Sequence, residues 1–222
     1  MRAILLAFCL TLAASPALAQ QPSPVVERAA AEAKAILARE NLIRELGAMG
    51  AIDYAARTTF LRARKDASPS DREALDTVWA EHYEPIDHRN TQRLKVLLEN
   101  RGWFTDEEVG SRAASAAFSV VSHADDLDFQ KAVLAKMEPL VATGKAPNGY
   151  ANLYDRVALQ EKRPQRYGTQ GTSCVGDKHA VPADLEVPAS VDQRRAALGL
   201  EPMSVYLAGL DKTYGRCDVP KR

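Results

Sequence analysis

The sequence predicts an all-α protein: a single irregular multi-helix domain of about eight helices, with a loop-rich C-terminal part. Apolar residues recur with a period near 3.6 along most of the 222 residues, as amphipathic helices require. Helix-start signals such as Ser23-Pro24 and Thr105-Asp106 stand in front of these periodic runs. Glycine, proline, threonine and aspartate are dense over residues 165–188, where we expect a loop with one short strand. Strand content should therefore be very low.

The first helix is expected to begin at Pro24, because proline fits the first helical position and a serine precedes it. Gly47 and Gly50 should interrupt the pattern, so a second helix should begin near Ala51. Ser70-Asp71-Arg72-Glu73 has the form of a capping box and should open the third helix. The predicted helices cover about residues 24–46, 51–65, 70–101, 105–123, 126–143, 148–163, 190–198 and 202–214.

Proline and aspartate set the boundaries of the later helices. Pro85 should kink or split the third helix, because proline has no backbone N–H to donate. Asp126 or Asp128 should cap the fifth helix. The sixth should stop before Pro164, since the residue before a proline disfavours helical backbone angles.

The N-terminus has the pattern of a secretory signal peptide over residues 1–19. Arg2 supplies a positive charge, and Ile4–Ala14 is an apolar run too short to span a bilayer. Ala17-Leu18-Ala19 fits a cleavage site, so the mature chain should start at Gln20. The mature protein would then be exported, and would be periplasmic or extracellular.

Two further regions follow the predicted signal peptide. Residues 20–68 would form an N-terminal helical hairpin or extension, and residues 69–222 the main helical domain. No later segment approaches the roughly 18 consecutive apolar residues of a membrane span. We therefore expect a soluble chain without a membrane-spanning helix.

Removal of the signal peptide would remove Cys9 and leave Cys174 and Cys217. An oxidising compartment favours a disulfide between them, worth roughly 3–4 kcal/mol in the chain-entropy model. The alternatives are two free thiols, or a metal site that joins Cys174 with His179. The metal reading is weaker, because the chain has no paired C-x-x-C or H-x-x-x-H spacing. We expect no metal and no cofactor.

The charge balance argues against a nucleic-acid partner. The chain has 29 basic and 29 acidic residues, whereas nucleic-acid binding calls for a basic face. No G-x-S-x-G, H-E-x-x-H, P-loop or G-x-G-x-x-G motif is present. The expected partner is a small molecule, a peptide or an envelope protein, of unknown identity.

Two polar side chains interrupt the apolar face of the helix that follows Pro85. Asp87 and Asn90 fall on the stripe that carries Ile86, Leu94 and other apolar residues. A carboxylate on a core-facing stripe must be paired, because burial of a bare charge is costly. These residues either stabilise a neighbouring helix or belong to a site.

His123 lies at the edge of a small-residue helix face, near the end of its helix. A neutral imidazole there could act as a base, an acid or a ligand, or could simply satisfy the last carbonyls of the helix. Asp125, Asp126 and Asp128 follow it. Caps for the next helix are a better explanation of these aspartates than a metal cluster.

A third polar region runs from the sixth helix into the loop. Asp155 and Arg156 lie outside the apolar face of that helix, on opposite sides, and could reach different neighbours. Gln165, Tyr167 and Gln170 then place donors and acceptors on a non-helical backbone. Such a loop either carries function or caps helix ends.

These positions and several others form one ordered pattern. It is carried by Asp87, Asn90, Leu94, Gly102-Trp103, Val109-Gly110, His123-Ala124-Asp125, Gln130, Asp155-Arg156-Val157 and Pro164-Gln165-Arg166-Tyr167-Gly168-Thr169-Gln170. The pattern resembles the bacterial family known as domain of unknown function 6624, over about Trp79–Tyr206. It departs from that family at Phe104, where proline is usual, and at Ser122, where glutamine is common. The resemblance implies a helical, often exported protein and no known activity.

The polar residues on or beside core-facing stripes need partners, so we expect them to converge on one pocket. Slightly favoured is a ligand- or partner-binding module, with Asn90, Arg156, Gln165, Tyr167 and Gln170 as binding residues. The alternative is a hydrolytic enzyme with His123 as general base and Asp87 or Asp155 as its partner. Arg156, Tyr167 and Gln170 would then stabilise developing charge.

Overall fold

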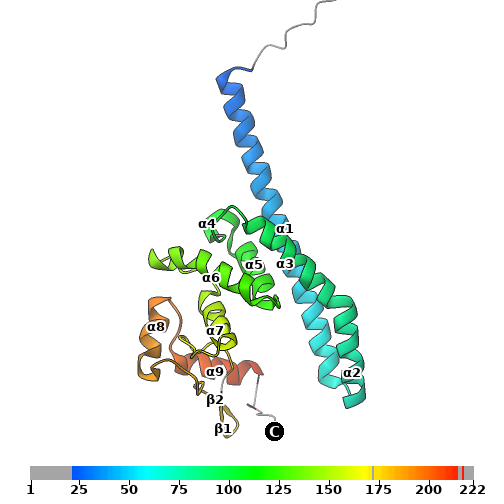
Figure 1. Ribbon diagram of the computed structural model, residues 1–222, viewed down its shortest axis with the longest axis vertical. Helices are drawn as coiled ribbons and strands as arrows, with labels where there is room; N and C mark the ends of the chain where they lie inside the picture. The colour runs from blue at the N-terminus through cyan, green and yellow to red at the C-terminus, as the bar shows by residue number, and fades with distance from the viewer. Residues whose placement is uncertain (1–21, 172, 215–216, 218–222) are drawn as a thin grey trace, which may run out of the picture. The chain divides into compact units, whose positions relative to one another are not determined.

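The computed structural model describes residues 22–171, 173–214 and 217 (Figure 1). The predicted signal peptide and its cleavage site lie outside these residues. The helices and strands, in chain order, are α1 (Pro24–Asp66), α2 (Pro69–Val78), a π-helical segment (Trp79–Tyr83), α3 (Glu84–Leu98), α4 (Asp106–Val109), α5 (Ser111–His123), α6 (Leu127–Ala142), α7 (Tyr150–Gln160), β1 (Ser173–Val175), β2 (Lys178–Ala180), a 3₁₀ turn (Pro188–Ser190), α8 (Val191–Ala197) and α9 (Met203–Tyr214).

The chain divides into two compact units, residues 1–38 and 39–222. The described part of the first unit is exposed helix, and all of the features that follow belong to the second. The all-α prediction is confirmed, since the described strands form a single two-stranded antiparallel sheet. None of the helices in the described ranges has the length and apolar character needed to cross a membrane.

Helix α1 is continuous, so the predicted interruption at Gly47 and Gly50 is wrong. Gly50 instead permits close packing: a Cβ at this position would lie 2.5 Å from the Cβ of Ala116 on α5. A glycine in a helix interior costs up to about 1 kcal/mol relative to alanine. Burial of Leu46 and Met49 on the same face offsets that cost, and the helix continues.

The N-cap of the next helix lies two residues earlier than predicted. Ser68, not Ser70, is the N-cap of α2, and its side chain accepts a hydrogen bond from the backbone N–H of Asp71 at 3.2 Å. Pro85 acts as predicted, because it cannot donate to the carbonyl four residues earlier. The helix widens before it into the π-helical segment, where the N–H of Glu84 bonds to the carbonyl of Trp79.

A predicted single helix over residues 105–123 is divided into α4 and α5. Gly110 between them has a φ of 79° and a ψ of 151°, which ends α4 and restarts the chain as α5. In the main core α5 packs against α3 and α6, and residues of α7 and of the second half of α1 complete the core (Figure 1). Its fully or nearly fully buried side chains include Leu46, Leu94, Leu98, Phe104, Ala117, Val121, Val133, Met137, Leu153 and Val157.

The C-terminal part is small and cross-linked. A second apolar cluster is formed by Leu185, Val191 of α8 and Met203 of α9, and it holds these two helices together. The predicted disulfide is confirmed: Cys174 on β1 is bonded to Cys217, with 5.7 Å between their Cα atoms. This bond ties the hairpin to the chain that follows α9.

Candidate functional site: an Asp–His–Arg cleft

Three helices bring four charged or ionisable side chains together. Asp53 and Arg57 lie one turn apart on α1, Asp87 lies in the first turn of α3, and His123 is the last residue of α5. Asp53 follows Leu46 and Met49 at helical spacing on the core-facing stripe, and its residue is only 5% exposed. A buried carboxylate in that position requires partners.

Those partners are His123 and Arg57. The two carboxylate oxygens of Asp53 lie 2.8 and 3.1 Å from Nδ1 of His123. Arg57 donates from Nε to Asp53 at 2.9 Å and from its terminal nitrogen to Asp87 at 2.6 Å. Its guanidinium also lies over the Trp79 ring, 4.9 Å from the centroid. Arg57 therefore joins both carboxylates and holds them in place.

The contacts of His123 favour one tautomer of its ring. Nδ1 lies within hydrogen-bond distance of both Asp53 and the Nε of Arg57, at 2.8 and 2.9 Å. An unprotonated Nδ1 would point a lone pair at a carboxylate, which is repulsive. A neutral imidazole with its proton on Nδ1 avoids this repulsion: it donates to Asp53, and the Nε of Arg57 then bonds to the carboxylate. In that tautomer Nε2 of the imidazole keeps a free lone pair, and it has no hydrogen-bond partner among the described residues.

The two carboxylates of the cluster have opposite electrostatic environments. Burial raises the pKa of Asp53, but hydrogen bonds and charge from His123 and Arg57 outweigh burial and leave that pKa below its usual value. Burial is also the largest influence on Asp87, and it raises the pKa of that carboxyl despite the charge of Arg57. Asp53 is thus the carboxylate held in its ionised form beside the imidazole.

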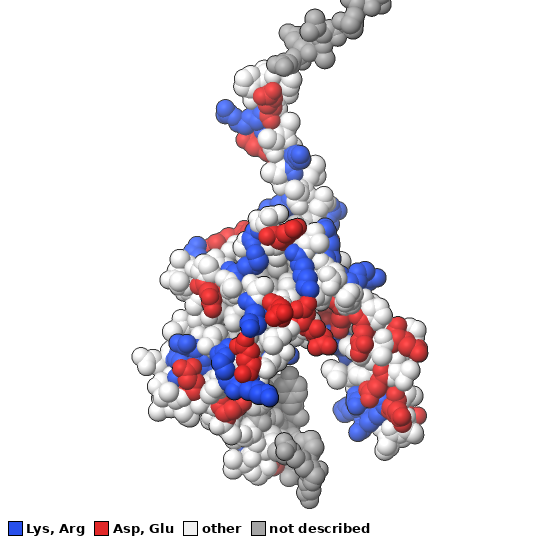
Figure 2. All heavy atoms as spheres, in the orientation of Figure 1, with Lys and Arg blue, Asp and Glu red and all other residues white. Residues whose placement is uncertain are grey.

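His123 opens onto a cleft of about 490 Å³. Its side chain is 32% exposed, whereas that of Asp53 is 6% exposed, so the imidazole faces the cleft and the carboxylate lies behind it. The cleft is lined by Arg57, Trp79, Glu84, Asp87, His88, Thr91, Gln92, His123, Ala124, Asp125 and Asp126. Figure 2 shows acidic side chains beside the recess between the α2–α3 arm and the helical body.

The end of α5 is held rigidly, which fixes the position of His123. Buried Gln130 donates to the carbonyls of Val121 and Ala124 at 3.1 and 3.0 Å, and Gln160 donates to Gln130 at 2.7 Å. Gln130 therefore satisfies carbonyls that would otherwise be unpaired at the helix terminus.

Asp126 is the N-cap of α6, as one of the two predicted alternatives stated. It accepts from the backbone N–H of Phe129 at 2.8 Å and from Lys95 at 2.6 Å. In the ranges that the structure describes, no group of three or more His, Cys, Asp or Glu is placed to hold a metal ion.

Asp155 belongs to a different cluster, on the loop side of α7. It is fully buried and accepts from the backbone N–H groups of Arg166, Tyr167 and Thr169 at 2.7, 3.0 and 2.8 Å. The hydroxyl of Thr169 adds a fourth bond at 2.8 Å. All of its oxygens are engaged by the loop, so the carboxylate that contacts His123 is Asp53 rather than Asp155 or Asp87.

The other loop residues are also engaged within the loop. Gln165 donates to the carbonyl of Gln170 at 2.6 Å and accepts from its N–H at 2.8 Å. The ring of Tyr167 packs edge-on against Tyr154 of α7, with 5.6 Å between centroids. No hydrogen bond or ion pair joins this group to His123 or Asp87 in the part of the chain that the structure describes.

Two of the expected binding residues are without polar partners. Arg156 forms no hydrogen bond or ion pair within the described residues, and burial together with the positive charge of Arg57 lowers its pKa. Asn90 is 7% exposed and its side-chain amide has no hydrogen-bond partner among the described residues either. The structure therefore places Arg156 within electrostatic reach of the cluster, and Asn90 next to the cleft residue Thr91.

Comparison with known proteins identifies a family and nothing closer. The model of a family described as "Family of unknown function (DUF6624)" matches residues 40–218. The match begins well before Trp79, where the resemblance was expected to begin, so it includes Asp53 and Arg57. No curated protein and no solved structure matches the chain.

Proposed function

Because the chain belongs to the DUF6624 family, whose function is unknown, we propose a function from the cleft itself: a hydrolytic enzyme with His123 as general base. The observation that carries the proposal is the 2.8 Å contact between Asp53 and Nδ1 of His123. It leaves Nε2 as an unprotonated nitrogen on a half-exposed side chain at a concave surface. A general base requires this combination of a free nitrogen and an orienting partner.

The proposed reaction is attack of water on the acyl carbon of an ester or amide. Nε2 of His123 removes a proton from the water while its oxygen bonds to the acyl carbon. Asp53 stabilises the imidazolium that forms, and the same proton then passes to the leaving oxygen or nitrogen as its bond to carbon breaks. Among the described lining residues Thr91 alone has a hydroxyl, and it forms no hydrogen bond to His123, so water is the simplest nucleophile.

Positive charge near the base supports the proposal. Arg156 has unused donors and lies close enough to Arg57 for the two charges to interact. Its guanidinium could stabilise the negative oxygen that develops on the acyl group. Tyr167 and Gln170 were expected to share this role, but the Tyr167 ring packs against Tyr154 and the Gln170 side-chain amide donates to the carbonyls of Asn152 and Thr169.

The competing function is ligand binding without chemistry, which the sequence slightly favoured. The observation that supports it is Asn90, whose side-chain amide forms no hydrogen bond among the described residues and is therefore available to a ligand. A bound ligand near Asn90 would use the cleft as a recognition surface, and His123 would then be a hydrogen-bond acceptor rather than a base.

The test is hydrolysis of p-nitrophenyl butyrate and of the corresponding p-nitroanilide by the wild-type chain and by His123→Ala and Asp53→Asn. We expect each substitution to lower the rate by about 10²- to 10⁴-fold, the usual contribution of a general base. His88→Ala is the matched control, since His88 lines the same cleft and is exposed. A wild-type rate equal to that of buffer with both substrates, or full activity in His123→Ala, would contradict the proposal.

A further inference from the structure

A second hollow adjoins the cleft of His123. It has a volume of about 420 Å³ and is lined by Arg57, Phe60, Leu61, Asp76, Trp79 and Glu84. Arg57, Trp79 and Glu84 line both spaces, so the two are continuous at these residues. We call the second space the aromatic hollow, after Phe60 and Trp79.

The aromatic hollow has an apolar wall that the described residues cover only in part. The rings of Phe60 and Trp79 lie 4.8 Å apart, and Trp79 stacks on Tyr83 at 5.1 Å. Leu61 beside them is 63% exposed. Apolar surface gains roughly 25 cal/mol per Å² when it leaves water, so an apolar group of a ligand would be stabilised here.

The π-helical segment explains why this wall exists. The widened turn before Pro85 carries both Trp79 and Tyr83, and π-helical turns are frequent at functional sites. Trp79 also supports the guanidinium of Arg57 by a cation–π contact, and Arg57 holds Asp53. Trp79 thus borders the aromatic hollow and, through Arg57, helps to hold Asp53, the partner of His123.

The charges of the two spaces disfavour an anionic occupant. Arg57 is already paired with Asp53 and Asp87, so two negative charges face its one positive charge. Glu84 and Asp125 form no ion pair within residues 22–171, 173–214 and 217, and each adds an uncompensated negative charge to the lining. A substrate with a carboxylate or phosphate would meet this negative potential.

We infer that the substrate is a neutral or positively charged ester or amide whose apolar group lies in the aromatic hollow. This inference rests on the proposed hydrolytic function and names its substrate class. The scissile bond would lie beside His123, and a short alkyl chain or a single ring would extend past Trp79 to Phe60 and Leu61. A basic or polar group of the substrate would face Glu84 or Asp125.

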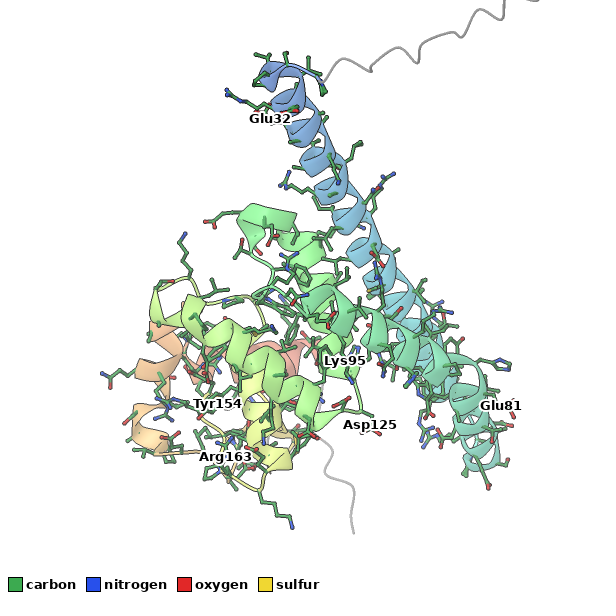
Figure 3. The ribbon with its side chains drawn as sticks, turned by 45° about the horizontal axis from the view of Figure 1, so that its top comes forward. Glu32, Glu81, Lys95, Asp125, Tyr154 and Arg163 are labelled. Atoms are coloured by element: carbon green, nitrogen blue, oxygen red, sulfur yellow. A yellow bond between two sulfur atoms is a disulfide. The ribbon has the colours of Figure 1, made fainter. Side chains whose placement is uncertain are left out.

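The first experiment compares two probes that share one apolar body, 4-phenylbutylamine and 4-phenylbutyrate, by calorimetric titration. We expect the amine to bind at least about tenfold more tightly than the carboxylate, a difference of about 1.4 kcal/mol. Glu84→Gln should remove most of that preference. Glu81→Gln should preserve it, since Glu81, labelled at the right of Figure 3, is exposed on the π-helical segment and lines neither space. Equal or tighter binding of the carboxylate would overturn the inference.

The second experiment tests the apolar wall. Leu61→Gln should weaken binding of 4-phenylbutylamine by about fivefold or more, because it removes apolar surface from the hollow. Val96→Gln is the control, as Val96 is a similarly exposed apolar residue (57% against 63%) on α3, outside both linings. Equal effects of the two substitutions would contradict a role for the aromatic hollow.

Both experiments measure binding and can fail separately from the hydrolytic function. His123→Ala should bind 4-phenylbutylamine as the wild-type chain does, although it should not hydrolyse p-nitrophenyl butyrate. Probe discrimination without any hydrolysis would reject the enzyme and keep the ligand class. Hydrolysis of p-nitrophenyl acetate and hexanoate at equal rates, without probe binding, would keep the enzyme and reject the ligand class.

Discussion

Asp53 and Asp155 are buried to almost the same degree, at 5% and 0% exposure, yet their surroundings differ in kind. Asp155 accepts three backbone N–H groups and one hydroxyl, all from the loop beyond α7. Asp53 is bonded to two titratable or charged side chains, His123 and Arg57, at the back of a cleft. The backbone donors around Asp155 hold a loop in shape, whereas the imidazole that faces the cleft retains a nitrogen that can exchange protons.

The comparison explains why burial of a carboxylate is a poor guide to function by itself. A carboxylate whose oxygens are all bonded to backbone donors fixes the chain around it. A carboxylate that orients a histidine leaves the other ring nitrogen available to a substrate. The partners of the carboxylate, and not its exposure, separate the two roles.

The largest expected effect is the difference in unfolding free energy between an Asp155 variant and an Asp53 variant. Asp155→Ala should lower the free energy of unfolding by about 3 kcal/mol or more, because several buried N–H groups lose their acceptor at once. Asp53→Ala should cost less, since the side chains of Arg57 and His123 are 25% and 32% exposed and can bond to water. Urea unfolding of the two variants measures the difference, and a larger loss for Asp53→Ala would reverse the comparison.

A smaller effect is expected where α1 approaches α5, the contact that brings Asp53 to His123. Gly50→Ala would place a methyl group 2.5 Å from the Cβ of Ala116, so it should destabilise the fold by about 1–3 kcal/mol. The matched control is Gly47→Ala, where a Cβ would meet no atom within 4 Å. That substitution should stabilise the helix by up to about 1 kcal/mol. Thermal melting should show opposite shifts, and a stabilised Gly50→Ala would contradict the close packing.

The smallest effect concerns stability in acid. The pKa of Asp53 lies below its usual 3.8, so the unfolded chain takes up this proton first as the pH falls. The stability that Asp53 contributes is thus complete above about pH 3.8 and is lost as the pH falls through the folded value. The pKa of Asp87 is raised, so the folded chain takes up that proton first and gains stability as the pH falls.

The two carboxylates of the cleft therefore provide opposite controls. Asp53→Asn should make the acid loss of stability shallower, and Asp87→Asn should make it steeper. Unfolding by urea at several values between about pH 6 and pH 3 measures both slopes. Equal slopes of unfolding free energy against pH in the two variants would contradict the opposite pKa shifts of Asp53 and Asp87.

The sequence predicts most of the fold because the signals are local. Helical periodicity, Ser and Asp caps and Pro85 each act over a few residues, and the elements they predict are present. Gly50 misled the prediction, because a glycine that interrupts a helix and one that permits close packing look alike in sequence. The difference depends on Ala116, which lies 66 positions later in the chain and touches Gly50 only in the folded protein.

The candidate site was predicted only in part. His123 and Asp87 were singled out and do lie together, but Asp53 and Arg57 were missed. Asp53 sits on an apolar stripe just as Asp87 does, so the same criterion could have found it had the helix not been broken before it. That Asp53 contacts His123, 70 residues away, depends on tertiary packing and has no local signal.

No pattern in the sequence indicated the role of Asp155 either. Its four donors are three backbone N–H groups and a hydroxyl, and backbone groups are common to every residue type except proline. The polar residues of the loop suggested a binding surface, whereas they bond to one another, to α7 and to α8.

The most direct test of the account is the protonation state of His123 at neutral pH. Two-bond ¹⁵N–¹H correlation spectra of ¹⁵N-labelled protein distinguish the two neutral tautomers, and His123→Gln identifies the signal among the four histidines of the chain. The account predicts a proton on Nδ1, an unprotonated Nε2, and loss of this tautomer preference in Asp53→Asn. A proton on Nε2, with Nδ1 accepting from Arg57, would contradict it.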